Sequence, residues 1–198
     1  IAVAIMSILF VSQSTRGDEE EGRLEIIQSL AVGRVAYSNA VMIILITVNI
    51  TLTLILGFGL ALLNVEGMDL ASCILFGAIL GATGLIFGGM TAVVAQLIEN
   101  ARITTMISLT ILIIAYIIRA IGDVNSELLS LISPLGWTVR TSVFVENDWL
   151  PVIVLTFVTI LLGLLAFYLH SKRDLGAGLI EPRKGKAHAN AFLQSPIG

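Results

Sequence analysis

The stretch that decides the fold is LASCILFGAILGATGLIFGGMTAVVAQLI, residues Leu70 to Ile98. It contains no charged side chain. At about 1.5 Å of rise per residue, an α-helix of this length crosses the ~30 Å hydrocarbon core of a bilayer. A helix in a soluble core rarely needs so long an apolar run. The sequence therefore predicts a membrane-spanning helix here.

Similar apolar runs lie on both sides of this stretch. We expect spans at residues 38–63, 103–121 and 150–170, and a partial span at 1–11 whose start precedes Ile1. Of the 198 residues, 57% are hydrophobic and 13% charged, and the mean hydropathy is +0.98; a soluble domain usually has nearly twice that charged fraction. The predicted fold class is all-α, a polytopic transmembrane helix bundle. A net charge of -3 gives no basis for nucleic-acid binding.

Small residues recur along the quoted stretch: Gly77, Gly81, Gly84 and Gly88 are three or four positions apart. At helical spacing they lie on one face, and a face without side chains lets a second helix approach closely within a membrane. We expect this glycine stripe to be a helix-packing face. The alternative is a face that also slides or opens during transport.

Hydrogen-bonding side chains, chiefly Asn49 and Thr53, lie near the middle of the 38–63 run. An unpaired amide in hydrocarbon is costly, so these groups must find partners. Two interpretations are open at this point. They bond between helices, or they line a substrate pathway.

The basic residues are divided unequally between the two ends of the expected spans. Nine of the eleven lysines and arginines lie in the first loop, in the turn before 103–121 and in the tail; the two on the opposite side are Arg119 and Arg140. Loops rich in lysine and arginine stay in the cytoplasm. We therefore expect a multi-pass plasma-membrane protein with a transmembrane part at 1–175, a cytoplasmic first loop and a cytoplasmic linker at 176–198.

The first loop contains the most informative polar stretch, residues 18–32. Asp18 followed by Glu21 fits a capping box, so we expect an amphipathic helix to begin at Asp18. An interfacial helix usually presents a basic face to anionic lipid, so an acidic face suits a protein partner better; the alternative is a solvated connector. The residues expected to contact that partner are Asp18, Glu20, Glu21, Arg23, Leu24 and Glu25.

Residues 122–149, between the last two spans, combine apolar and aromatic side chains that favour a membrane interface. We expect one short helix that Pro134 and Gly136 end, in a segment that lies on the outer side of the bilayer or dips into it. Arg119, four residues before Asp123, is expected to be an outer anchor paired with that carboxylate.

The sequence carries no pattern that indicates an enzyme, and we expect no catalytic residues and no cofactor. A phosphate-binding loop ending at Lys186 would need glycine where Ile180 stands, so any ATP must be bound by a partner. His170 and His188 are single, so surface roles and no metal site are expected. Spans without acidic residues argue against an ion-coupled secondary carrier. That carrier and, less favoured, a membrane-embedded enzyme are the alternative functions.

Four stretches give the chain a resemblance to a known family: TRGDEEEGRLE from Thr15, RAIGD from Arg119, SPLGW from Ser133 and RDLGAG from Arg173. With these stretches in this order, the chain resembles the permeases of ABC transporters of the type-2 exporter class, including polyketide-antibiotic exporters of the tetronasin-resistance type. The resemblance covers nearly the whole chain.

The resemblance implies a function and a set of partners. The element at 18–32 would be the coupling helix that docks on a separate ATP-binding subunit, and the exported substrate would be an amphiphilic small molecule. The family's permeases have two similar six-helix halves. This chain would be most of the first half, working with a second half or a second copy in the lipid bilayer.

Overall fold

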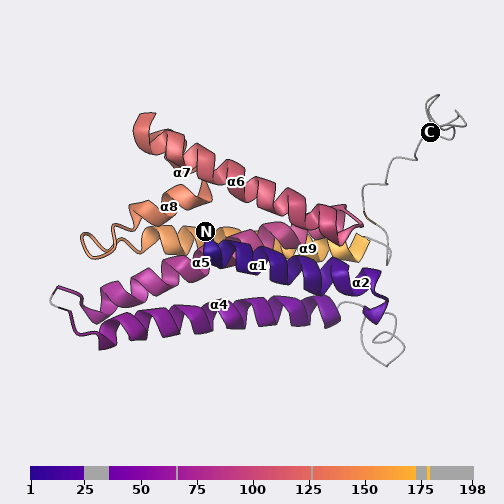
Figure 1. Ribbon diagram of the computed structural model, residues 1–198, viewed down its shortest axis with the longest axis horizontal. Helices are drawn as coiled ribbons and strands as arrows, with labels where there is room; N and C mark the ends of the chain where they lie inside the picture. The colour runs from indigo at the N-terminus through magenta and orange to yellow at the C-terminus, as the bar shows by residue number, and fades with distance from the viewer. Residues whose placement is uncertain (25–35, 66, 126, 173–177, 179–198) are drawn as a thin grey trace, which may run out of the picture.

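The structure is a computed structural model that describes residues 1–24, 36–65, 67–125, 127–172 and 178. The described residues form helices and connecting turns, with no strand among them. Four of the helices are long and apolar enough to cross a membrane: α4 (Ala36–Leu62), α5 (Leu70–Leu97), α6 (Ala101–Asn125) and α9 (Leu150–Lys172). The all-α, polytopic fold class is confirmed (Figure 1).

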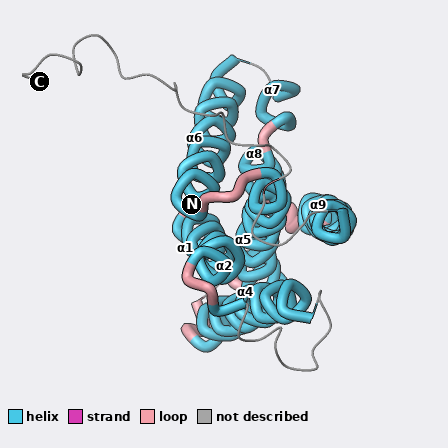
Figure 2. Tube along the Cα trace, turned by 90° about the vertical axis from the view of Figure 1, so that its right-hand side faces the viewer, coloured by secondary structure: helices cyan, strands magenta, loops and turns pink. Residues whose placement is uncertain are grey.

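Helix α5 lies at the centre of the bundle. It packs against α4, α9, α6 and α1 (Ala2–Ser12), which surround it in Figure 2. Its many glycines and alanines leave room for those neighbours. In the most apolar 18-residue stretch of α5, 61% is buried inside the bundle, whereas the corresponding stretch of α9 is 11% buried. The core is formed where Phe87 and Ile86 of α5 meet Ile8 of α1 and Leu155 of α9.

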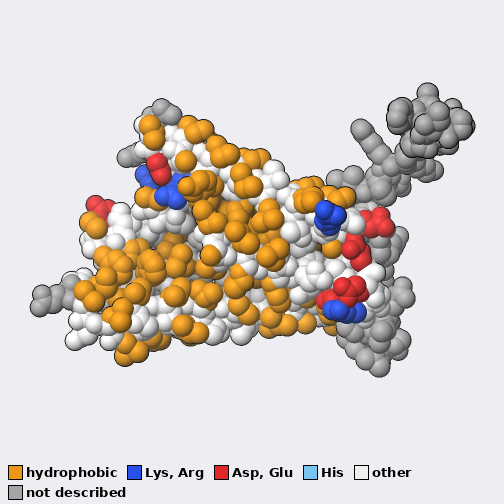
Figure 3. Space-filling model, viewed as in Figure 1, with side chains coloured by type: hydrophobic (Ala, Val, Ile, Leu, Met, Phe, Trp, Pro, Cys, Tyr) orange, Lys and Arg blue, Asp and Glu red, His pale blue; other side chains and the backbone are white. Residues whose placement is uncertain are grey.

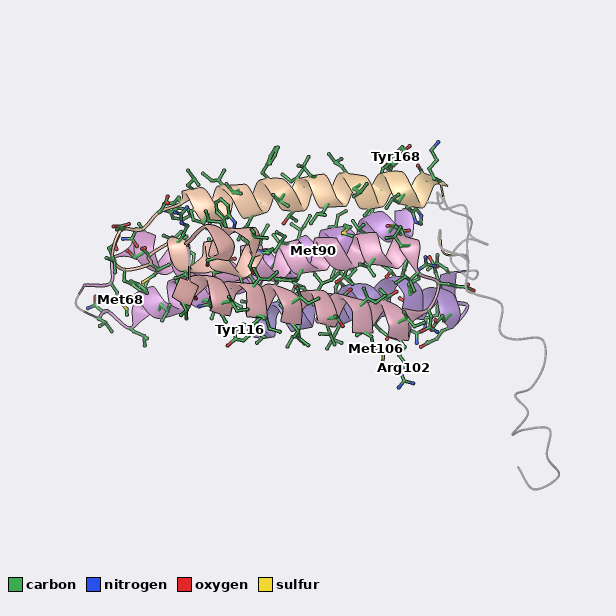
Figure 4. All side chains as sticks on the ribbon, turned by 90° about the horizontal axis from the view of Figure 1, so that it is seen from above. Met68, Met90, Arg102, Met106, Tyr116 and Tyr168 are labelled. Atoms are coloured by element: carbon green, nitrogen blue, oxygen red, sulfur yellow. The ribbon has the colours of Figure 1, made fainter. Side chains whose placement is uncertain are left out.

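The outward faces of α4, α6 and α9 are apolar and exposed. In Figure 4, Met106 and Tyr116 point away from the bundle on α6, and Tyr168 does so on α9, where the ammonium of Lys172 lies 5.8 Å from the ring centre. Figure 3 shows a broad apolar band with charged groups gathered at the two ends. So large an apolar surface suits hydrocarbon rather than water.

The charged groups define two ends of the molecule. We call one the α2 end; it comprises residues 12–24, the turn at 98–100 and the last turn of α9. The other, the α8 end, comprises the turn residues 63–65 and 67–69 together with residues 122–125 and 127–149. At the α8 end, Arg119 Nε lies 3.3 Å from Asp123 Oδ2, the pairing expected from the spacing.

The helix expected at 18–32 is described only over residues 18–24, where an α-helical segment does start at Asp18 but has no capped start. Helix α1, the π-helix η1 (Gln13–Gly17) and α2 (Asp18–Glu20) form one continuous helical run, and Asp18 has right-handed helical dihedrals. The backbone N–H of Glu21 still bonds to the carbonyl of Gly17 at 3.0 Å. The run ends at Gly22, whose φ of +72° is readily adopted only by glycine.

The segment expected to hold one short helix contains two, α7 (Glu127–Ile132) and α8 (Pro134–Arg140). The first helix ends before Pro134, as expected, because the residue that precedes a proline disfavours helical dihedrals and Ser133 is extended. Pro134 also starts α8, because its missing N–H falls where the first turn needs none, and the Ser133 hydroxyl accepts from Leu135 N at 3.2 Å. Gly136 lies inside α8. Its lack of a side chain is needed because a Cβ there would overlap the backbone of Ser130.

The expected surface role of His170 is wrong. Only 7% of this residue is exposed, because its ring lies between α9 and α5 with Nδ1 3.2 Å from Gln96 Oε1. Its position at the end of a span placed it near the membrane edge in sequence. The orientation of the side chain toward α5 depends on how the helices pack.

Candidate functional site

A partly buried polar network occupies the α2 end of the bundle. Its side chains come from the run α1–η1–α2, and their partners come from α4, α5 and α6. The members of this α2-end network are Ser12, Arg16, Asp18, Glu19, Glu20, Arg23, Tyr37 and Thr105.

Arg16 is the buried cation of the network. It is 1% exposed; its Nη1 lies 2.7 Å from Glu19 Oε2, and its Nε donates to the carbonyl of Ala95. Ala95 lies in the last turn of α5, where carbonyls lack helical partners and the helix dipole favours a cation. Arg16 lies in the π-helical turn, which rotates the residues that follow it about the helix axis. Such π-bulges are frequent at functional sites. In the sequence, Arg16 was counted only as a loop charge.

Glu20 and Ser12 hold the start of α6. The carboxylate of Glu20 accepts from the backbone N–H of Ala101 at 2.8 Å, and an anion is favoured at this helix terminus. The Ser12 hydroxyl lies 2.6 Å from Thr105 Oγ1 and donates to the carbonyl of Ala101 at 3.0 Å. The run α1–η1–α2 therefore places a cation at the end of α5 and an anion at the start of α6.

Asp18 connects the same run to α4. Its carboxylate accepts from the hydroxyl of Tyr37 in the first turn of α4, and its Oδ1 lies 2.9 Å from Arg23 Nη1. Only 8% of Asp18 is exposed. The hydroxyl of Tyr37 was not recognised in the sequence, because nothing in the spacing pairs it with Asp18.

The residues expected to contact a partner protein thus differ in exposure. Asp18 and Leu24 are buried, and Glu20 is exposed while it bonds to α6. Glu21 is exposed and pairs with the exposed Arg23. Glu25 and the rest of the predicted coupling helix, residues 25–32, lie outside the described residues.

The glycine stripe lies against α4 and α1. Cβ atoms on Gly77 and Gly81 would overlap the carbonyl and the hydroxyl of Thr53, and a Cβ on Gly88 would lie 2.7 Å from the side chain of Leu45. The hydroxyl of Thr53 donates to the carbonyl of Gly77 at 3.1 Å. The stripe and the mid-span polar residues, which the sequence presents as two separate patterns, therefore form one interface.

Asn49 lies where three helices meet. It is fully buried on α4; its Nδ2 donates to Ser7 Oγ of α1 at 3.3 Å and to its own helix at Leu45 O. Its Oδ1 has no conventional donor among the described residues and faces Gly84 of α5, where a Cβ would overlap it. A Cα–H of Gly84 is thus directed at that oxygen, a weak contact that membrane helix interfaces use. In the described structure Asn49 meets neighbouring helices and not an open cavity.

Two further stretches singled out in the sequence meet at the α8 end. Gly122 of RAIGD and Gly136 of SPLGW both approach the backbone of Ser130 so closely that neither position has room for a Cβ. Ser133 Oγ donates to the carbonyl of Ala115 at 2.6 Å, which ties this segment to α6. At the other end Gly178 packs on the turn after α5, where a Cβ at this position would lie 2.8 Å from Leu97 O.

Comparison with known proteins gives two matches. A family model described as the multidrug efflux system permease Rv1217c, C-terminal domain, matches residues 1–170. The multidrug efflux system permease protein Rv1217c of Mycobacterium tuberculosis (strain ATCC 25618 / H37Rv) is 36% identical over 196 residues, which is 99% of this chain and 35% of that protein. The chain thus spans about a third of the curated relative. The family model describes a C-terminal domain, whereas the sequence placed the chain in a first half, and this placement stays a prediction.

Proposed function

This chain belongs to the family of the multidrug efflux permease Rv1217c, C-terminal domain, and from that premise we propose that it is part of the membrane-spanning subunit of an ATP-driven exporter. The relative is named as a permease, which is a transport subunit rather than an enzyme. A separate ATPase supplies the energy, and the substrate is an amphiphilic compound such as a polyketide-type antibiotic or another drug. The remainder of the permease, or a second copy, completes the transport path.

The α2-end network is the observation that supports coupling to an ATPase. Through Arg16, Asp18 and Glu20, the run α1–η1–α2 is bonded to the adjacent ends of α5, α4 and α6. A partner that moves residues 18–24 therefore moves four helices together. Exposed Glu21 and Arg23 are the described groups available for contact with that partner, and Asp18 acts by positioning them.

The proposal places the α2 end in the cytoplasm and the α8 end outside the cell. In a cysteine-free full-length permease, including replacement of the buried Cys73, we expect Val145→Cys to react with an impermeant thiol reagent added to intact cells. Glu21→Cys should react only after the membrane is opened. Val145 is 82% exposed and Glu21 is also exposed, so access to both depends on sidedness. Labelling of Glu21→Cys from outside would invert the topology.

Charge reversal tests the contact with the ATPase. We expect Glu21→Lys combined with Glu25→Lys to insert normally but to bind the ATPase at least ~10-fold more weakly, a loss of about 1.4 kcal/mol, because like charges at an interface repel. Single exposed charges contribute only ~0–1 kcal/mol to folding, so the membrane domain should survive. The measurement is co-purification with the ATPase at several salt concentrations.

Glu146→Lys is the matched control, since it reverses an exposed carboxylate at the α8 end. It should leave co-purification unchanged. If the double variant retains the ATPase as fully as Glu146→Lys does, the acidic residues are a solvated connector and the proposed coupling role is wrong.

A further inference from the structure

A cavity of about 930 Å³ lies at the α8 end, between the end of α6, helices α7 and α8, and the start of α9. Its volume is within the range of ~300–1,000 Å³ that is common for small-molecule sites. The α2-end network takes no part in it. Nothing in the proposed coupling accounts for a space of this size.

Part of the cavity lining is apolar. The indole of Trp137 is fixed by a hydrogen bond of 2.9 Å from its Nε1 to the carbonyl of Leu131. Leu131 itself, and Leu150 and Pro151 at the start of α9, also line the cavity. An aromatic face held in one orientation can bind the apolar body of a ligand, and it also attracts a cation.

Most of the charged side chains that line the cavity are acidic. Asp123, Glu146 and Asp148 contribute carboxylates, and Arg140 contributes the one cationic side chain among the described lining residues. Arg119 of α6 pairs with Asp123 and so lowers the net negative charge near the cavity, but the three carboxylates still outnumber the two guanidinium groups. Asp148 Oδ1 accepts from Leu150 N at 2.9 Å, and Asp123 Oδ1 accepts from Ser130 Oγ at 3.0 Å, so both carboxylates are held in place.

From the apolar lining residues and the excess of carboxylates over cationic side chains, we propose that this cavity binds an organic cation with a large apolar body. Its role as the site from which an exported compound leaves rests on the proposed function, whereas binding itself does not. The same chemistry is present in the ammonium headgroup of a zwitterionic lipid. A drug-like cation and such a lipid therefore compete for one site.

The probe is radiolabelled tetraphenylphosphonium, measured by equilibrium binding to the full-length permease in phosphatidylglycerol nanodiscs. We expect saturable binding that the double variant Glu146→Gln, Asp148→Asn weakens roughly tenfold, because two nearby charges are removed. An amide oxygen at position 148 can still accept from Leu150 N, so the start of α9 keeps its hydrogen bond. Triphenylphosphine oxide, which is neutral, should bind equally to both proteins. Glu99→Gln, at the exposed turn of the α2 end, is the matched control and should bind the cation as the unaltered permease does.

Three outcomes decide the proposal. No saturable binding to the unaltered permease, or equal affinity in that protein and the double variant, overturns the cation site. Binding as expected in a permease that exports nothing supports the site and contradicts the proposed function. If phosphatidylethanolamine, but not phosphatidylglycerol, displaces the probe and co-purifies only with the unaltered protein, the cation is a lipid headgroup and the release role is overturned.

Discussion

Gly84→Leu is expected to prevent the full-length permease from folding. A Cβ at this position would overlap Asn49 Oδ1 and lie 2.7 Å from Val3 Cγ1 and 2.9 Å from Ser7 Oγ, so a leucine must push α5 away from both α4 and α1. Overpacking usually costs ~1–3 kcal/mol and sometimes more. We expect at least the upper value here, because separating the helices also removes contacts that lipid does not replace.

The measurement is the yield of monodisperse protein in mild detergent, followed by its resistance to thermal unfolding. Gly163→Leu on α9 is the matched control, because its Cβ would meet no atom within 4 Å. It adds the same apolar side chain to a membrane helix and should leave the yield unchanged. Equal yields for the two variants would contradict the packing role of the glycine stripe.

Arg16→Met is expected to have the other large effect. It keeps an unbranched side chain of similar length but removes the cation from Glu19 and the donor from Ala95 O. Removing one partner of a buried ion pair typically costs about 3–5 kcal/mol, since the remaining charge stays buried. We expect lower thermal stability and loss of the connection between α2 and the end of α5. Arg16→Lys should recover only part of the stability, because an ammonium cannot reproduce the guanidinium fork.

Arg102→Met provides the control for charge. Arg102 is exposed at the same end, on the first turn of α6, and points away from the bundle in Figure 4. Its replacement removes the same charge without a buried partner and should change stability by less than ~1 kcal/mol. If Arg16→Met unfolds at the same temperature as Arg102→Met, Arg16 does not hold the α2-end network together.

The membrane-spanning architecture could be predicted because it depends on local properties. A run such as 70–98 is both long enough and apolar enough to span a bilayer wherever its neighbours lie. The continuity of the helical run through Asp18 could not be predicted in the same way. A capping box stabilises a terminus only if the preceding residues leave the helix, and here the buried bonds of Arg16 hold them in a π-helical turn.

The pairing of distant residues could not be predicted from spacing. The glycine stripe and Asn49 each indicated a contact face, yet only the register of α4 against α5 brings Gly84 to the amide of Asn49. The same is true of Tyr37 with Asp18 and of His170 with Gln96. Spacing within one helix tells on which face of that helix a side chain lies. Which residue of another helix it contacts there is set by tertiary packing.

The most direct test of the central claim is transport into inside-out membrane vesicles that contain the full-length permease with its ATPase. A fluorescent amphiphilic antibiotic serves as the probe, and ATP or an imposed proton gradient is supplied separately. We expect accumulation that requires ATP and both proteins, and that the double variant Glu21→Lys, Glu25→Lys abolishes. Accumulation driven by the proton gradient without ATP, or ATP-driven accumulation that survives the double reversal, would contradict the account.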